Sequence, residues 1–249
     1  MLNPQLLLLI APALGGSDPV VQPPDPTLED KPVLHKWIGS VTAGAVITDG
    51  NTQTRSANAT GDAQYRREDD RTTFGALWNY QDDKSGVLQR RTSGKAQYDY
   101  FFRPKTYGLA QTSAENDKEA DLDLRWTAGV GVGQQFIENT VHKFSAEAGV
   151  SWVDENFAAS PDSSYAAARG AYTFDWNINK DWVFYNAAQV FPSLERAEDI
   201  YTKVDTRLKV TLTEKMFAQA QWVMDWDNTP AGNNKRIDNR YILSIGWSF

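Results

Sequence analysis

The stretch IYTKVDTRLKVTL, residues 200–212, alternates apolar and charged residues almost without interruption. Ile200, Val204 and Leu208 fall on one side of an extended chain, and the charged residues between them fall on the other. A helix would scatter the same charges around its circumference, so the pattern predicts a β-strand with one apolar and one charged face.

The same alternation recurs along the chain from Trp37 onward, for example in FGALWNY (74–80) and KFSAEAGVSW (143–152). It predicts about twelve strands, which we expect to begin near residues 37, 52, 72, 88, 105, 121, 141, 164, 181, 199, 214 and 237. Most of them reach about ten residues, which is long for a globular strand and suits a tilted strand that crosses a bilayer. Helix signals are nearly absent.

Aromatic residues lie near both ends of these segments, and the chain stops on one of them in RYILSIGWSF (240–249). Two aromatic bands, and connections that alternate between short and longer, are typical of barrels in a bilayer. We therefore expect an all-β fold, a transmembrane antiparallel up-and-down β-barrel over residues 36–249. A secreted soluble β-rich binding protein stays open as an alternative, although its strands would rarely carry Trp or Tyr near both ends.

The first 35 residues differ in composition from the rest. Leu6 to Leu14 form a short apolar run that ends in small residues, so we expect a signal peptide over residues 1–16, although no Lys or Arg precedes the run. Residues 17–35 are rich in proline and predict a flexible periplasmic tether.

Several classes of function are disfavoured by composition. The formal net charge of −7 argues against a nucleic-acid partner. The absence of cysteine excludes thiol catalysis and zinc-thiolate sites. The two histidines, His35 and His142, are both expected at the periplasmic end of the barrel. A Ser-His pair would act at the opposite, outer rim, so we expect no catalytic site. The acidic loop segments match no EF-hand spacing, so no metal and no cofactor are expected.

If the aromatic faces of the strands touch lipid, the charged faces point into the barrel interior. The predicted lumen-facing charges are Lys95, Asp99, Asp123, Arg125, Glu147, Arg169, Asp175, Lys203, Asp205, Arg207 and Lys209. Unpaired charges in a dry interior are costly, so these residues either pair across strands or face water. Pairing favours a closed barrel with a structural or envelope-stress role. If the charges face water instead, the interior suits a narrow channel for small solutes or ions, with the basic residues of 201–211 along one side.

Several segments together resemble one family, namely GNTQTRS (50–56), YDYFFRPKTYGLAQTSAENDKEADLDLRWTAGVGVG (98–133), SAEAGVSWVDE (145–155), FPSLE (191–195), DNTP (227–230) and GWSF (246–249). They are similar to the YdiY-like salt-induced outer membrane proteins, also called domain of unknown function 481, over about residues 37–249. The resemblance implies a barrel in the bacterial outer membrane and brings no established reaction or catalytic residue.

The resemblance also concerns partners. Tyr241, Trp247 and the terminal Phe249 resemble the signal by which the barrel-assembly machinery recognises outer-membrane substrates. We expect that machinery as a partner during biogenesis, together with outer-membrane lipid and lipopolysaccharide, and we expect a monomer.

Overall fold

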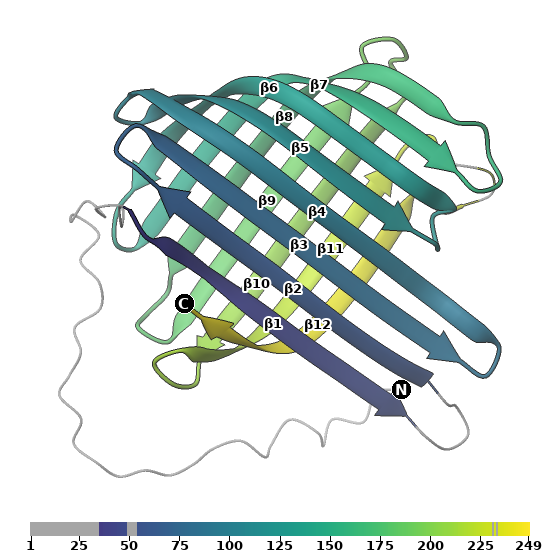
Figure 1. Cartoon of the computed structure of the whole chain (residues 1–249), viewed down its shortest axis with the longest axis horizontal. Coiled ribbons are helices and arrows are strands. Elements are labelled where there is room, and N and C mark those ends of the chain that lie inside the picture. The colour runs from purple at the N-terminus through teal and green to yellow at the C-terminus, as the bar shows by residue number, and fades with distance from the viewer. Residues whose placement is uncertain (1–34, 49–53, 231, 233) are drawn as a thin grey trace.

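Twelve antiparallel strands form one closed barrel in the computed structural model, which describes residues 35–48, 54–230, 232 and 234–249 (Figure 1). The strands are β1 (Trp37–Thr48), β2 (Thr54–Arg66), β3 (Asp70–Asp83), β4 (Gly86–Arg103), β5 (Thr106–Asp117), β6 (Leu122–Glu138), β7 (His142–Phe157), β8 (Ser163–Asn177), β9 (Trp182–Pro192), β10 (Ile200–Thr211), β11 (Met216–Asp227) and β12 (Ile237–Ser248). The all-β, twelve-stranded prediction is confirmed, and each strand begins within two residues of its predicted start. The predicted signal peptide, and the tether up to residue 34, lie outside the described residues.

Each strand pairs with its neighbour in sequence, and the last strand returns to the first. Phe249 exchanges two backbone hydrogen bonds with Gly39, at 3.1 and 3.0 Å, and Trp247 lies opposite Val41 in the register. β12 therefore closes the sheet against β1. In the part of the chain that the structure describes, there is no helix long and apolar enough to cross a membrane.

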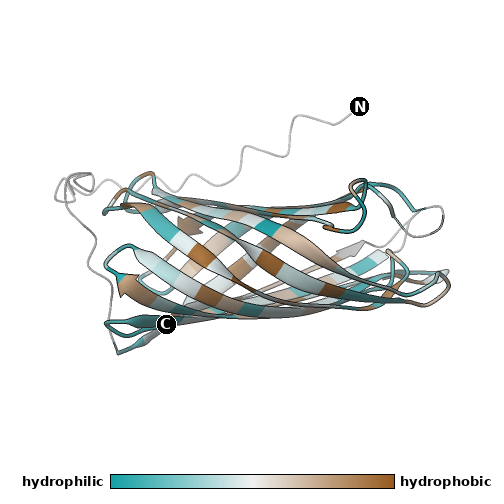
Figure 2. Ribbon diagram, turned by 90° about the horizontal axis from the view of Figure 1, so that it is seen from above, coloured by the Kyte–Doolittle hydropathy of each residue, from teal (hydrophilic) through white to brown (hydrophobic). Residues whose placement is uncertain are grey.

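Burial follows the pleat of the strands, because successive side chains point to opposite faces. On β12, Tyr241 is 80% exposed and Leu243 is 74% exposed, whereas Arg240 and Ile242 between them are 7% and 6% exposed. Tyr241, Leu243, Ile245 and Trp247 of this strand are thus on the outside of the barrel, whereas the inner face carries Arg240 and Ser244 together with the apolar Ile242. Hydrophobic and hydrophilic residues alternate along the strands in the same way in Figure 2.

The two ends of the barrel differ in their connections. We call the end with segments 84–85, 118–121, 158–162 and 193–199, at which β1 and β11 also end, the loop end. The turn end carries segments 67–69, 104–105, 139–141, 178–181 and 212–215, together with the start of β1 and the end of β12. Exposed tryptophans lie near both ends, among them Trp126 and Trp152 toward the loop end and Trp37 and Trp247 toward the turn end.

Candidate functional site: the charged barrel interior

A cluster of charged side chains fills the barrel near its loop end. We call it the loop-end network; its members are Arg91, Glu115, Asp117, Arg125, Lys203, Asp225 and Arg240. Arg91 is its centre and is only 2% exposed. The guanidinium of Arg91 lies 2.8 Å from Glu115, 3.3 Å from Asp117 and 2.6 Å from Asp225.

Three of these ion pairs join opposite walls of the barrel. One of them joins Arg240 on β12 to Asp117 on β5, at 3.6 Å and across five strand-to-strand steps. Arg91 on β4 and Asp225 on β11 are five strand-to-strand steps apart, roughly 24 Å along the wall at about 4.8 Å per step. Lys203 on β10 meets Glu115 on β5 at 2.7 Å, also five steps away. Side chains alone bridge all three gaps, so the cross-section is flattened at this level. Figure 2 shows the two walls lying close together.

The remaining cations of the network complete the pairing. Arg240 contacts both Asp117, at 3.6 Å, and Asp225. Arg125 donates to Glu155 at 2.6 Å, and its guanidinium lies 4.1 Å from the centre of the Tyr201 ring. Every basic side chain of the network therefore has a carboxylate within ion-pair distance.

Packing leaves little open space around these charges. The β7 to β10 side is filled by a cluster of buried apolar residues, Val153, Tyr165, Ala167, Phe191 and Tyr201. The hydroxyl of Tyr201 donates to Asp225 at 2.6 Å and links this cluster to the loop-end network. A cavity of about 40 Å³ remains among Arg91, Glu115 and Tyr201, which is room for a few water molecules.

The middle of the interior holds a further cross-barrel contact. Arg207 on β10 lies 2.6 Å from Asp205 on its own strand and 2.8 Å from Asp62 on β2, four strands away. The amide of Gln221 donates to Asp205 at 2.9 Å, and the ring of Tyr185 lies 5.0 Å from the Arg207 guanidinium. This part of the wall is therefore also tied together by charge.

Two lysines of the interior are in a different situation. Lys209 lies 3.8 Å from the Phe217 ring centre and 3.1 Å from the Ser248 hydroxyl. Lys95 on β4 is within electrostatic range of Asp62, Asp205 and Arg207 and remains accessible to solvent. Among the described residues, neither lysine has a carboxylate within ion-pair distance.

Toward the turn end the charges form a third group. Glu147 on β7 accepts hydrogen bonds from Arg169 at 2.9 Å, from the Tyr107 hydroxyl at 2.8 Å and from Gln97 at 2.9 Å. Asp99 is fully buried and accepts from Arg71 at 2.6 Å.

The outermost turn carries one ion pair of its own. The side chain of Arg67 donates to Asp70 at 2.8 Å, and that hydrogen bond raises the pKa of Arg67.

The predicted lumen charges are distributed over these three groups, with one deviation. Asp175 contributes only at longer range, toward Lys143 and Arg207. Asp123 lies in a register irregularity between Leu122 and Leu124, and the inward position that simple alternation gives to Asp123 is taken by Leu122, which is 2% exposed. A β-bulge inserts one extra residue and so shifts which side chain points inward.

Sequence reasoning missed the most important members of the loop-end network: Arg91, Glu115, Asp117, Asp225 and Arg240. Arg91 follows another arginine, so alternation alone did not decide which of the two points inward. Glu115 and Asp117 lie on β5, whose inward face begins with the apolar side chains of Tyr107 and Leu109. Polarity therefore does not mark the inner face of that strand.

Other sequence candidates lie away from the interior. His142 stacks at the turn end on Phe174 and Trp176, with 6.0 Å between ring centres in both cases. His35 precedes β1 and is exposed. Tyr241, Trp247 and Phe249 are exposed on the outer face. Within the described ranges, no group of three or more Asp, Glu or His side chains is arranged to hold a metal ion.

Comparison with known proteins adds the family. The model described as "Protein of unknown function, DUF481" matches residues 41–249. The chain belongs to the DUF481 family. The sequence matches none of the curated proteins compared with it.

Solved structures similar to this DUF481 chain are outer-membrane barrels. The NanC porin is 8% identical, with a TM-score of 0.50, and the match covers 85% of this chain and 98% of NanC. The translocator domain of the autotransporter NalP from Neisseria meningitidis is 12% identical, with a TM-score of 0.45 and coverage of 86% and 88%. The outer membrane channel DcaP of Acinetobacter baumannii is 11% identical, with a TM-score of 0.40 and coverage of 86% and 96%. At 8% identity the likeness to NanC shows a shared fold and nothing of substrate or role.

Proposed function

We propose that this DUF481 protein is a barrel of the bacterial outer membrane with a structural or envelope-stress role, and that its interior is closed at the loop end. The observation that carries the proposal is the pair of ionic contacts between opposite walls, Arg91 with Asp225 and Lys203 with Glu115. A chain that conducts solutes at all times would have to keep this cross-section open.

The cost of burying charge also supports an interior that is closed at the loop end. Charges taken out of water are costly, and they persist in a narrow interior only where each has a partner at close range. The loop-end network meets this condition, because Arg91 alone contacts three carboxylates. Cross-wall pairs hold the two sides of a flattened barrel together, which a load-bearing wall protein requires.

Planar-bilayer recording tests the closed interior. The wild-type protein is expected to give no unitary conductance steps. The double variant Arg91→Ala/Lys203→Ala, which removes two of the cross-wall cations, is expected to give steps or leak current. Well-defined steps from the wild-type protein would contradict a closed barrel.

A second candidate function is a narrow channel for small anions. It is favoured by Lys95 and Lys209, which have no carboxylate at ion-pair distance among the described residues. If wild-type steps are seen, Lys203→Glu and Arg207→Glu should shift ion selectivity toward cations.

Membrane fractionation tests the location. The protein should stay with outer membranes after a carbonate wash, and recovery in the soluble periplasmic fraction would contradict it.

A further inference from the structure

A broad apolar groove lies on the wall formed by β1 to β5 and has a volume of about 590 Å³. Its rim contains Val41, Phe74, Trp126 and Phe249, which are 52%, 45%, 43% and 51% exposed. These side chains belong to the outer face, so the groove opens toward the surroundings of the barrel and not toward its interior.

The groove floor is one row of small residues placed side by side by the register. Gly61 on β2 is opposite Ala76 on β3, Ala76 is opposite Gly94 on β4, and Gly94 is opposite Ala114 on β5. Val41 on β1 and Trp126 on β6 continue the same row on either side. The result is a trough across four strands with a bulky side chain at each end.

The glycines in this floor are not required by the barrel itself. A Cβ added at Gly61 or Gly94 would meet no atom closer than 3.9 Å, and both have ordinary extended backbone. At Gly131 and Gly149, by contrast, a Cβ would overlap the backbone of the neighbouring strand. Because glycine weakens a strand, its presence where a side chain would fit indicates that the hollow is kept free for something else.

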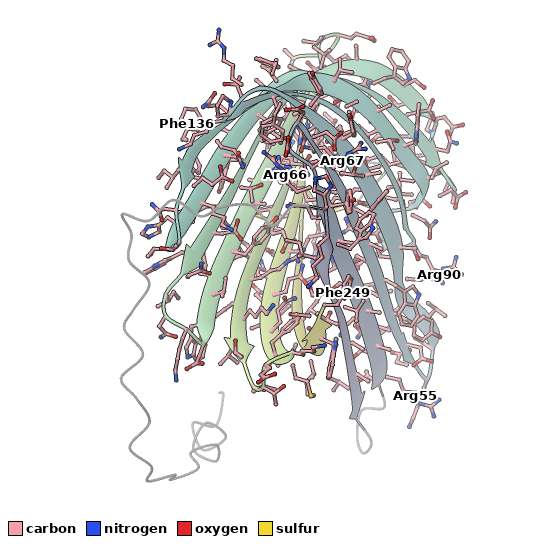
Figure 3. The ribbon with its side chains drawn as sticks, turned by 60° about the vertical axis from the view of Figure 1, so that its left-hand side comes forward. Arg55, Arg66, Arg67, Arg90, Phe136 and Phe249 are labelled. Carbon is pink, nitrogen blue, oxygen red and sulfur yellow. The ribbon has the colours of Figure 1, made fainter. Side chains whose placement is uncertain are left out.

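Two arginines lie on the outer face at the loop-end side of the groove. Arg55 on β2 and Arg90 on β4 project outward from the same side of the barrel (Figure 3). In the described part of the chain, neither guanidinium has an ion pair or a side-chain hydrogen bond. Asp82 is opposite Arg55 in the register, and its carboxylate accepts a hydrogen bond from Tyr80 at 3.3 Å.

The two arginines are spaced so that each can hold its own anionic group. They lie on strands separated by β3, so at least about 10 Å divides their backbones. A ligand that carries two phosphates can therefore engage both arginines at once. Arginine is suited to this because its planar fork binds phosphate through two parallel hydrogen bonds.

We propose that this groove binds an outer-leaflet glycolipid, with an acyl chain in the trough and sugar-linked phosphates on Arg55 and Arg90. In a bilayer the groove lies against hydrocarbon, and an acyl chain fills an apolar hollow there without leaving a void. The inference rests on the outer-membrane location proposed above and is independent of whether the interior is closed.

Lipid retention by the purified full chain tests this. The protein in detergent is given a diphosphorylated, multiply acylated glycolipid, or the same glycolipid without phosphates, and bound lipid is measured by native mass spectrometry. Wild type should retain one diphosphorylated molecule per barrel. Gly94→Leu, which fills the trough, should reduce retention at least tenfold, whereas Ala168→Leu on the outer face of β8 should not change it.

The charged half of the site has its own control. Arg55→Ala/Arg90→Ala should reduce retention of the diphosphorylated form to that of the dephosphorylated form, and Arg103→Ala at the turn end should have no effect. Retention of phosphatidylglycerol at the same level, unchanged retention by Gly94→Leu, or a second copy of the chain on this face would each overturn the proposal.

Folding and location are checked separately. The heat-dependent shift in electrophoretic mobility shows whether each variant forms a barrel, and carbonate extraction tests the location. A folded, membrane-embedded barrel that retains no glycolipid would overturn the lipid site and leave the proposed function intact.

Discussion

Replacing Arg91 by methionine should destabilise the barrel more than any other single change of charge. Methionine keeps most of the volume and removes a guanidinium that is 2% exposed and contacts Glu115, Asp117 and Asp225. Removing one partner of a buried ion pair costs about 3 to 5 kcal/mol, because an uncompensated charge is left behind.

The remaining contacts place the expected loss at the lower end of that range. Asp225 keeps Arg240 and the Tyr201 hydroxyl, and Glu115 keeps Lys203 at 2.7 Å. Asp117 keeps one cation, Arg240 at 3.6 Å, and the backbone N–H of Glu119 at 3.1 Å. One carboxylate is therefore poorly compensated, and we expect the free energy of unfolding to fall by about 3 kcal/mol.

The assay is urea unfolding in detergent micelles, followed by tryptophan fluorescence. Arg103→Met on the same strand is the matched control, because Arg103 is exposed and should change stability by less than about 0.5 kcal/mol. Adding Asp117→Asn to Arg91→Met should restore part of the loss. A loss below about 1 kcal/mol for Arg91→Met would refute the view that the loop-end network holds the walls together.

Three further perturbations test other parts of the structure. Arg207→Asp and Asp62→Arg should each destabilise the barrel, because the two groups lie 2.8 Å apart across the interior. The double reversal should recover about 1 kcal/mol or more of the free energy of unfolding in a double-mutant cycle. Simple additivity of the two single changes would contradict the contact. Gly149→Ala should prevent or strongly impair folding, since the new Cβ overlaps the backbone of β6. Gly108→Ala has open space around the new Cβ and should stabilise the barrel by about 0.5 kcal/mol. Equal effects of the two variants in urea unfolding would be inconsistent with this packing. Phe249→Ala should lower the yield of heat-modifiable barrel in cells and slow refolding in vesicles, because the Phe249 side chain packs where β12 closes on β1. An unchanged yield would argue against a role of Phe249 in assembly.

The outer face could be derived from the sequence because the bilayer imposes one rule on every strand. Most outward positions that face hydrocarbon are apolar, so strands such as β10 and β12 show their period directly. The inner face follows no such rule. Leu109 and Arg91 both point inward. An apolar side chain and a charged one are therefore both compatible with the inner face.

The partners inside the barrel could not be derived for a further reason. Arg91 and Asp225 are 134 residues apart and meet only because the barrel closes and flattens. No local pattern encodes either event. The bulge that exchanges Asp123 for Leu122 is likewise a property of the pairing between β6 and β7, not of either strand alone.

Flattening and charge pairing support each other in this barrel. A wide round lumen would hydrate its charges and need no pairs, but its walls would then be out of reach of one another. Once the walls approach, water is excluded, and each remaining charge must find a counter-charge on the facing wall. Arg91 and Lys203 meet that demand at one level, and Arg207 meets it at another. It follows that neutralising the cross-wall cations should release the walls as well as lower stability, so that conductance and unfolding free energy should change together in the same variants.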